Sequence, residues 1–138
     1  MLKRSVRKAL CTLVVLFVSA SSASAETKTF NVGNGDWFTP GNWMPSGVPA
    51  STDDVVIDAG HTVTLDAPGA TVATLTFNGG NLTGTGTLII TGLFTWTGGA
   101  LSGSGIVNAN GGITLAPASF VQLLDTRTLN NAGVANWT

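Results

Sequence analysis

The chain contains an internal repeat with a period of 19 residues. Residues 77–88 align without a gap on residues 96–107, with aromatic on aromatic, glycine on glycine, leucine on leucine and hydroxyl on hydroxyl. A unit of about 20 residues is too short to bury an apolar face alone, so such units gain a core by stacking on their neighbours. The repeat therefore predicts a chain built by stacking similar segments.

The repeat lies in a stretch without ionisable side chains. Residues 67–124 contain no Asp, Glu, Lys, Arg or His. Most general acids, bases and nucleophile activators belong to these residue types. The composition thus indicates a structural role and predicts no catalytic residue in this stretch.

The N-terminus has the organisation of a secretion signal, predicted over residues 1–25. A basic start is followed by an apolar run over residues 9–20, and Ala23 and Ala25 frame a small-residue cleavage site. The apolar run is short for a helix that spans a bilayer, which favours a signal over a membrane anchor. We expect export to the extracellular space or the cell surface, including association with an outer membrane, with no membrane insertion by the mature segment. Cys11 would leave with the signal.

The expected mature chain is acidic. Lys28 and Arg127 are its basic residues against seven acidic ones, a net charge of −5. Nucleic-acid binding needs a basic face to neutralise phosphates, and anionic lipids need the same. Both kinds of partner are therefore disfavoured.

Two further sections follow the signal. Residues 26–52 combine Trp37, Trp43 and three prolines among turn residues, which predicts an N-terminal cap with an aromatic plug. Residues 53–138 consist of short apolar runs, rich in β-branched residues, that are separated by glycine and small polar residues. This pattern is typical of strands, and we expect almost no helix.

Two all-β architectures fit this pattern. The Gly-Gly pairs at 79–80, 98–99 and 111–112 could be hairpin turns of an antiparallel β-sandwich. Alternatively, each repeat is one coil of a right-handed parallel β-solenoid, also called a β-helix, with glycine at its corners. The solenoid is favoured, because equivalent residues such as Leu82 and Leu101 would then stack at about 4.8 Å.

The tryptophan-rich opening followed by Asp53-Asp54-Val55-Val56-Ile57 resembles the start of bacterial secreted β-helix proteins. The segments 94–105, 110–115 and 129–133 are similar to coils of large adhesins and autotransporter passengers. This resemblance implies surface display, adhesion or matrix contact and supplies no catalytic residues. Since Asn136-Trp137-Thr138 looks like the start of another coil, we expect the solenoid to be truncated here, with Gly-Gly and further coils downstream.

Few residues offer chemistry. His61 is the single imidazole, and it reads as a solvated turn residue rather than a base. Asp53 and Asp54 are interpreted as turn caps before a strand, in preference to a glycosidase pair or a calcium site. No catalytic residue, metal site or cofactor is therefore predicted.

The tryptophans are candidate sugar-stacking platforms. For Trp37 and Trp43, packing within the cap is favoured over glycan stacking, and for Trp96 a core position is favoured. Loss of polysaccharide retention without loss of stability on their substitution would reverse this preference.

We expect a secreted, noncatalytic structural or adhesive repeat segment that makes weak, multivalent contact with polysaccharide or cell-surface glycans. One alternative is the N-terminal part of a carbohydrate-active β-helix enzyme, a lyase or hydrolase, whose catalytic coils are missing. Another is an antiparallel carbohydrate-binding module.

Overall fold

The computed structural model describes residues 24–116 and 122–138. The predicted basic and apolar leader and Ala23 lie outside the described residues. The helical structure described is one 3-10 turn, η1 (Pro40–Asn42). The strands, in chain order, are β1 (Thr27–Phe30), β2 (Asn34–Asp36), β3 (Trp43–Met44), β4 (Asp54–Ile57), β5 (Thr62–Thr64), β6 (Ala70–Val72), β7 (Thr74–Thr83), β8 (Thr87–Ile90), β9 (Phe94–Leu101), β10 (Ile106–Ala109), β11 (Ile113–Leu115), β12 (Gln122–Leu124), β13 (Thr128–Asn131) and β14 (Ala135–Trp137).

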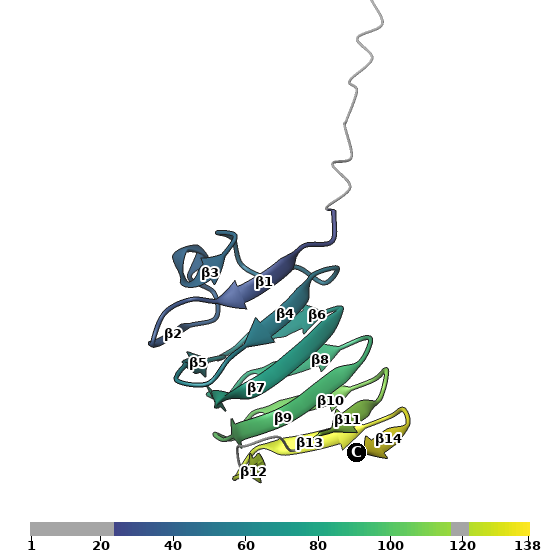
Figure 1. Cartoon of the computed structure of the whole chain (residues 1–138). Helices are drawn as coiled ribbons and strands as arrows, with labels where there is room; N and C mark the ends of the chain where they lie inside the picture. Colours follow the sequence, from purple (N-terminus) through teal and green to yellow (C-terminus); the bar gives the residue numbers. More distant parts are fainter. Residues whose placement is uncertain (1–23, 117–121) are drawn as a thin grey trace, which may run out of the picture.

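The strands stack as parallel coils, and the fold is a β-solenoid of about 4 turns (Figure 1). One sheet follows the order β14-β11-β9-β7-β4-β1-β3, with β2, β5 and β12 paired beside this path. The second sheet has the order β13-β10-β8-β6. Within residues 24–116 and 122–138, no helix is long and apolar enough to cross a membrane.

The register between β7 and β9 confirms the solenoid. Phe77 pairs with Trp96 and Leu82 pairs with Leu101, and the two strands run parallel. These pairs are the ones that the 19-residue repeat predicts, because each residue lies on its equivalent in the next coil. The antiparallel sandwich is therefore wrong for this stack.

The Gly-Gly pairs at 79–80 and 98–99 are neither hairpin turns nor coil corners. They lie inside the long strands β7 and β9, where the register shifts between Asn78 and Asn81. Gly99 has a φ of 93°, and a Cβ there would lie 2.6 Å from the carbonyl oxygen of Gly80. A β-bulge bends a strand without ending it, and glycine is common at such bulges. The Gly-Gly pairs therefore lie at bulges within continuous strands rather than at turns between strands.

The core fills the interior of the coils, between the two sheets. Side chains alternate inward and outward along the strands, as period-two patterning requires. The largest fully buried side chains of the core, each with an exposed fraction below 2%, are Phe30, Trp37, Trp43, Ile57, Leu65, Leu75, Phe77, Leu82, Leu88, Ile90, Phe94 and Leu101.

The first coil begins earlier than the sequence predicts. Strands β1 and β2, inside the expected cap 26–52, already pair in parallel with β4 and β5. The cap-like element is β3, which pairs antiparallel with β1 and lies at the end of the stack (Figure 1). Asp53 therefore does not mark the start of parallel stacking.

One corner of the last coil uses threonine where an earlier coil uses glycine. Leu124 pairs with Leu101, so Thr126 corresponds to Gly103 two residues further on. Both have positive φ, 62° for Thr126 and 78° for Gly103. A β-branched residue is disfavoured in this conformation.

Thr126→Gly should therefore raise the free energy of unfolding by about 1 kcal/mol, measured by urea denaturation. The control is Thr128→Gly, which places glycine inside β13 and should lower stability. A destabilised Thr126→Gly variant would contradict the assignment of this corner.

Candidate functional site

The outer surface of the larger sheet carries aligned polar side chains. Thr76 on β7 pairs with Thr95 on β9, and Thr95 pairs with Thr114 on β11. Asn136 on β14 continues the column. All three threonines are partly exposed because they alternate with inward core residues on the same strands. We call these three threonines the threonine column.

Two neighbouring positions extend this polar surface sideways. The Thr97 hydroxyl donates to Asn78 Oδ1 at 3.2 Å, and the Ser102 hydroxyl donates to Asn81 Oδ1 at 2.8 Å. Each bond joins successive coils, so the side chains are held in place. The result is an ordered, uncharged surface of hydroxyl and amide groups.

The aspartates of the first full coil bond to the next coil. Thr74 Oγ1 donates to Asp54 Oδ1 at 2.6 Å, and Asn78 Nδ2 donates to Asp58 Oδ1 at 2.9 Å. The backbone amide of Thr85 donates to Asp66 Oδ1 at 2.9 Å. The sequence predicts that Asp54 caps a turn, whereas its carboxylate accepts a hydrogen bond from the next coil. This partner is 20 positions away in the sequence, so the residues next to Asp54 do not reveal it.

Asp53 has the turn role that the sequence predicts. It is buried, and its Oδ2 accepts the backbone amide of Ala50 at 2.9 Å across a turn. Its Oδ1 accepts the backbone amide of Glu26 at 3.0 Å, which also holds the start of the first coil. Asp53 and Asp54 thus point to different surroundings and do not form a pair of carboxylates.

His61 lies in the predicted turn, between β4 and β5, but its side chain packs against the first coil rather than extending into solvent. Its Nδ1 lies 2.6 Å from the carbonyl oxygen of Val32, and its ring meets Phe30 edge-on with centroids 5.9 Å apart. The imidazole is half-buried. The hydrogen bond between His61 and Val32, which are 29 residues apart, holds the imidazole in this position.

The cap tryptophans form the expected aromatic plug. Trp37 and Trp43 are 0% and 1% exposed, their rings meet edge-on at 4.9 Å, and Trp43 Nε1 donates to the carbonyl oxygen of Trp37 at 2.7 Å. A stacking platform needs an exposed ring face. These two indoles therefore offer no surface to a sugar in this fold, and the candidate stacking role has no structural basis at them.

The other two tryptophans share one column. Trp96 pairs with Leu115, and Leu115 pairs with Trp137 on β14. Trp96 is 4% exposed, whereas Trp137 is 74% exposed. The difference in exposure arises because the next coil lies over Trp96 and none of the described coils lies over Trp137.

Both basic residues of the described chain are buried. Lys28 is 5% exposed, pairs with Glu26 at 2.8 Å, and donates to the carbonyl oxygens of Pro45 and Ser46. It therefore ties β1 to the loop after β3.

Arg127 is 3% exposed and reaches across two coils. Its guanidinium donates to the carbonyl oxygens of Ser102 at 2.8 Å, Gly84 at 2.9 Å and Gly86 at 3.2 Å. Burial lowers the pKa of this guanidinium, and the negative charge of Asp66 acts in the opposite direction. Sequence reasoning missed this residue because its partners lie 25 to 43 positions away.

Within residues 24–116 and 122–138 there is no pocket and no group of three or more His, Cys, Asp or Glu placed to hold a metal ion. The candidate surface is thus a flat face of the solenoid. No family model, curated protein or solved structure matches the chain.

Proposed function

We propose that this chain is a noncatalytic segment of a secreted bacterial repeat protein of the adhesin or autotransporter-passenger type. Residues 1–25 would direct export, and the solenoid would act at the cell surface or in the extracellular matrix. The threonine column is the observation on which the proposed binding role rests. Its ligands would be uncharged polysaccharides or cell-surface glycans.

The geometry supports weak, repeated contact. Successive strands of a sheet are about 4.8 Å apart, so the column offers a hydroxyl and a methyl group at each step. A polysaccharide also repeats along its length, and several weak contacts to one polymer give a large combined affinity. The absence of charge in residues 67–124 fits a neutral ligand.

The carboxylate contacts favour this proposal over the glycoside-cleaving alternative. A glycosidase needs one carboxyl group to transfer a proton and a second to act on the sugar or water. Asp54, Asp58 and Asp66 each accept a hydrogen bond from the next coil instead. The hairpin across residues 78–80, which would have favoured the antiparallel binding module, is replaced by the continuous strand β7.

A triple variant, Thr76→Val, Thr95→Val and Thr114→Val, tests the proposal. Valine keeps the shape and the preference for strands but removes the hydroxyl. Since one hydrogen bond contributes about 1 kcal/mol, retention on insoluble neutral polysaccharides should fall at least about tenfold. The melting temperature should stay close to that of the parent.

The matched control is Thr87→Val with Thr128→Val, on the smaller sheet. This variant should retain binding, because its substitutions lie away from the threonine column. Equal retention by the triple variant and the parent would refute the role of the column, as would equal loss in the control.

A further inference from the structure

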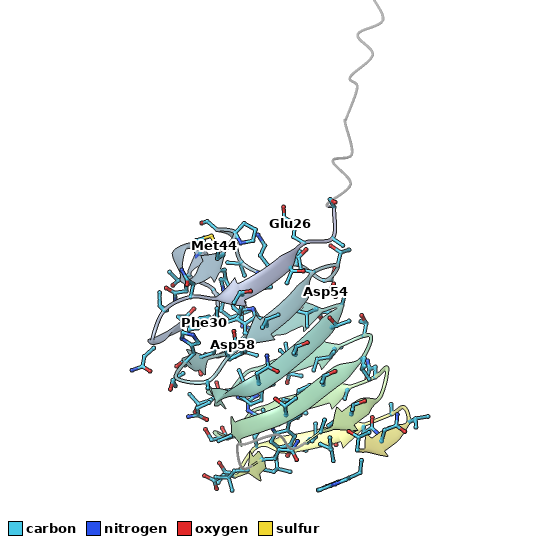
Figure 2. The ribbon with its side chains drawn as sticks, viewed as in Figure 1. Glu26, Phe30, Met44, Asp54 and Asp58 are labelled. Atoms are coloured by element: carbon cyan, nitrogen blue, oxygen red, sulfur yellow. The ribbon has the colours of Figure 1, made fainter. Side chains whose placement is uncertain are left out.

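The backbone nitrogen of Glu26 lies against a buried carboxylate at the N-terminal end of the solenoid. It donates to Asp53 Oδ1 at 3.0 Å, and Asp53 is 4% exposed. The other carboxylate oxygen, Oδ2, accepts the backbone amide of Ala50 at 2.9 Å. Figure 2 shows Glu26 at this end of the stack, near Asp54. Both oxygens of the buried carboxylate therefore take hydrogen bonds from backbone nitrogens.

The negative charge of Asp53 is not matched by a basic side chain. Among the residues that the structure describes, none forms an ion pair with Asp53, because Lys28 pairs with the Glu26 carboxylate at 2.8 Å. Arg127 donates to carbonyl oxygens of later coils. Moving a charge out of water is costly unless an opposite charge compensates for it. A positive group at this position would therefore stabilise the fold.

The same nitrogen belongs to the peptide bond at which the predicted signal ends. Cleavage after Ala25, at the site framed by Ala23 and Ala25, makes Glu26 the first residue. Ser24, Ala25 and Glu26 are exposed and precede β1, which begins at Thr27. Exposed chain outside a strand is the kind of segment that proteases cut. The fold therefore leaves this bond accessible.

Hydrolysis of this bond changes the group that faces Asp53. A signal peptidase breaks the bond between the Ala25 carbonyl carbon and the Glu26 nitrogen. The hydroxyl of a water molecule joins the carbon, and the remaining hydrogen of the water joins the nitrogen. At neutral pH the new carboxyl group loses its proton and the new amine takes one up. A neutral amide donor thereby becomes a positively charged ammonium.

Glu26 is held in place by two further contacts. Its carbonyl oxygen accepts the backbone amide of Asp54 at 2.8 Å, and its carboxylate pairs with Lys28. Lys28 is in turn buried and bound to two carbonyl oxygens of the loop after β3. Departure of the leader removes neither contact, so the new ammonium stays beside Asp53.

We propose that removal of the signal at the bond between Ala25 and Glu26 creates an ion pair between the Glu26 ammonium and the buried Asp53 carboxylate. The inference rests on the export signal of the proposed function and goes beyond it by assigning a role to the new N-terminus. The pair joins the start of β1 to the turn before β4, and the Asp53 carbonyl oxygen accepts the amide of Ala73 in the next coil at 2.9 Å. The first coil is therefore more stable in the mature chain than in the precursor.

Two forms of the chain 26–138, which contains every strand that the structure describes, test the ion pair directly. One carries a free amine on Glu26, and the other carries an acetyl group on the same nitrogen, which keeps an N–H donor and removes the charge. Because a charged donor makes a stronger hydrogen bond, the unfolding equilibrium constant of the free form should be about tenfold lower in urea denaturation. Hydrogen exchange should show the gain in β1.

Asp53→Asn removes the negative charge and keeps the size of the side chain. The free and acetylated forms of this variant should then be equally stable, since the charge that distinguishes them has lost its partner. Asp54→Asn is the matched control, because the neighbouring carboxylate accepts the Thr74 hydroxyl instead. It should preserve the full difference between the two forms. If Asp53→Asn does not fold, the comparison of the two parent forms still decides the question.

The full chain tests the processing step. It is expressed with its leader in a bacterium, and the mass of the exported protein identifies its first residue, which we expect to be Glu26. Export with a different first residue would overturn the inference and leave the proposed function standing, whereas failure of export would refute both. Equal stability of the free and acetylated parent forms would overturn the inference alone.

Discussion

Gly103→Ala should lower the free energy of unfolding by about 3 kcal/mol, from left-handed backbone strain together with overpacking. Gly103 has a φ of 78° at a corner, where it lies directly on Gly84 of the previous coil. A Cβ would collide with the Gly84 carbonyl oxygen and lie 2.7 Å from its amide nitrogen. The backbone cannot yield there without separating two coils. Urea denaturation, followed by circular dichroism, measures the loss.

Two other glycines separate the causes of this loss. Gly60 has a φ of 87°, but a Cβ added there would have no neighbour within 4 Å, so Gly60→Ala tests backbone conformation alone and should cost about 1 kcal/mol. Gly41 has neither a positive φ nor a close neighbour, and Gly41→Ala should change stability by less than about 0.5 kcal/mol. Equal losses in all three variants would contradict close stacking at Gly103.

Arg127→Met should lower the free energy of unfolding by about 3 kcal/mol, because it removes charged donors from three carbonyl oxygens. Those oxygens belong to Gly84, Gly86 and Ser102, so the loss loosens the contact among three coils. Hydrogen exchange should show the largest loss of protection in β13, which begins one residue after Arg127.

Arg127→Lys is the matched variant for this prediction. Lysine keeps the charge but cannot reproduce the forked donors of the guanidinium. The free energy of unfolding of Arg127→Lys should therefore lie between those of Arg127→Met and the parent. The guanidinium packs closely against Gly105, where an added Cβ would lie 2.8 Å from Arg127 Nη1. A methionine variant as stable as the parent would show that the guanidinium does not hold the coils together.

The repeat was enough to predict the stacking of coils. Equivalent side chains such as Leu82 and Leu101 recur because each packs against its counterpart in the next coil. This like-on-like packing leaves a direct trace in the sequence. The aromatic cap was predictable for a similar reason, since Trp37 and Trp43 are apolar bulk surrounded by turn residues.

The positions of glycine and of the charged residues were harder to predict. Glycine supplies positive φ and close backbone approach alike, so Gly79-Gly80 could not be distinguished from a turn before the register was known. Lys28 and Arg127 look like solvated charges in the sequence, yet carbonyl oxygens from distant segments surround them. The threonine column likewise emerges only when β7, β9 and β11 are placed in register.

The direction of β7 relative to β9 is the most direct test of the fold. Nuclear Overhauser contacts between backbone protons of these strands report which residues are neighbours. Parallel stacking predicts contacts that join the surroundings of Phe77 to Trp96 and those of Leu82 to Leu101. Contacts that join Phe77 to Leu101, or that pair the two halves of β7 across Gly79-Gly80, would contradict the solenoid.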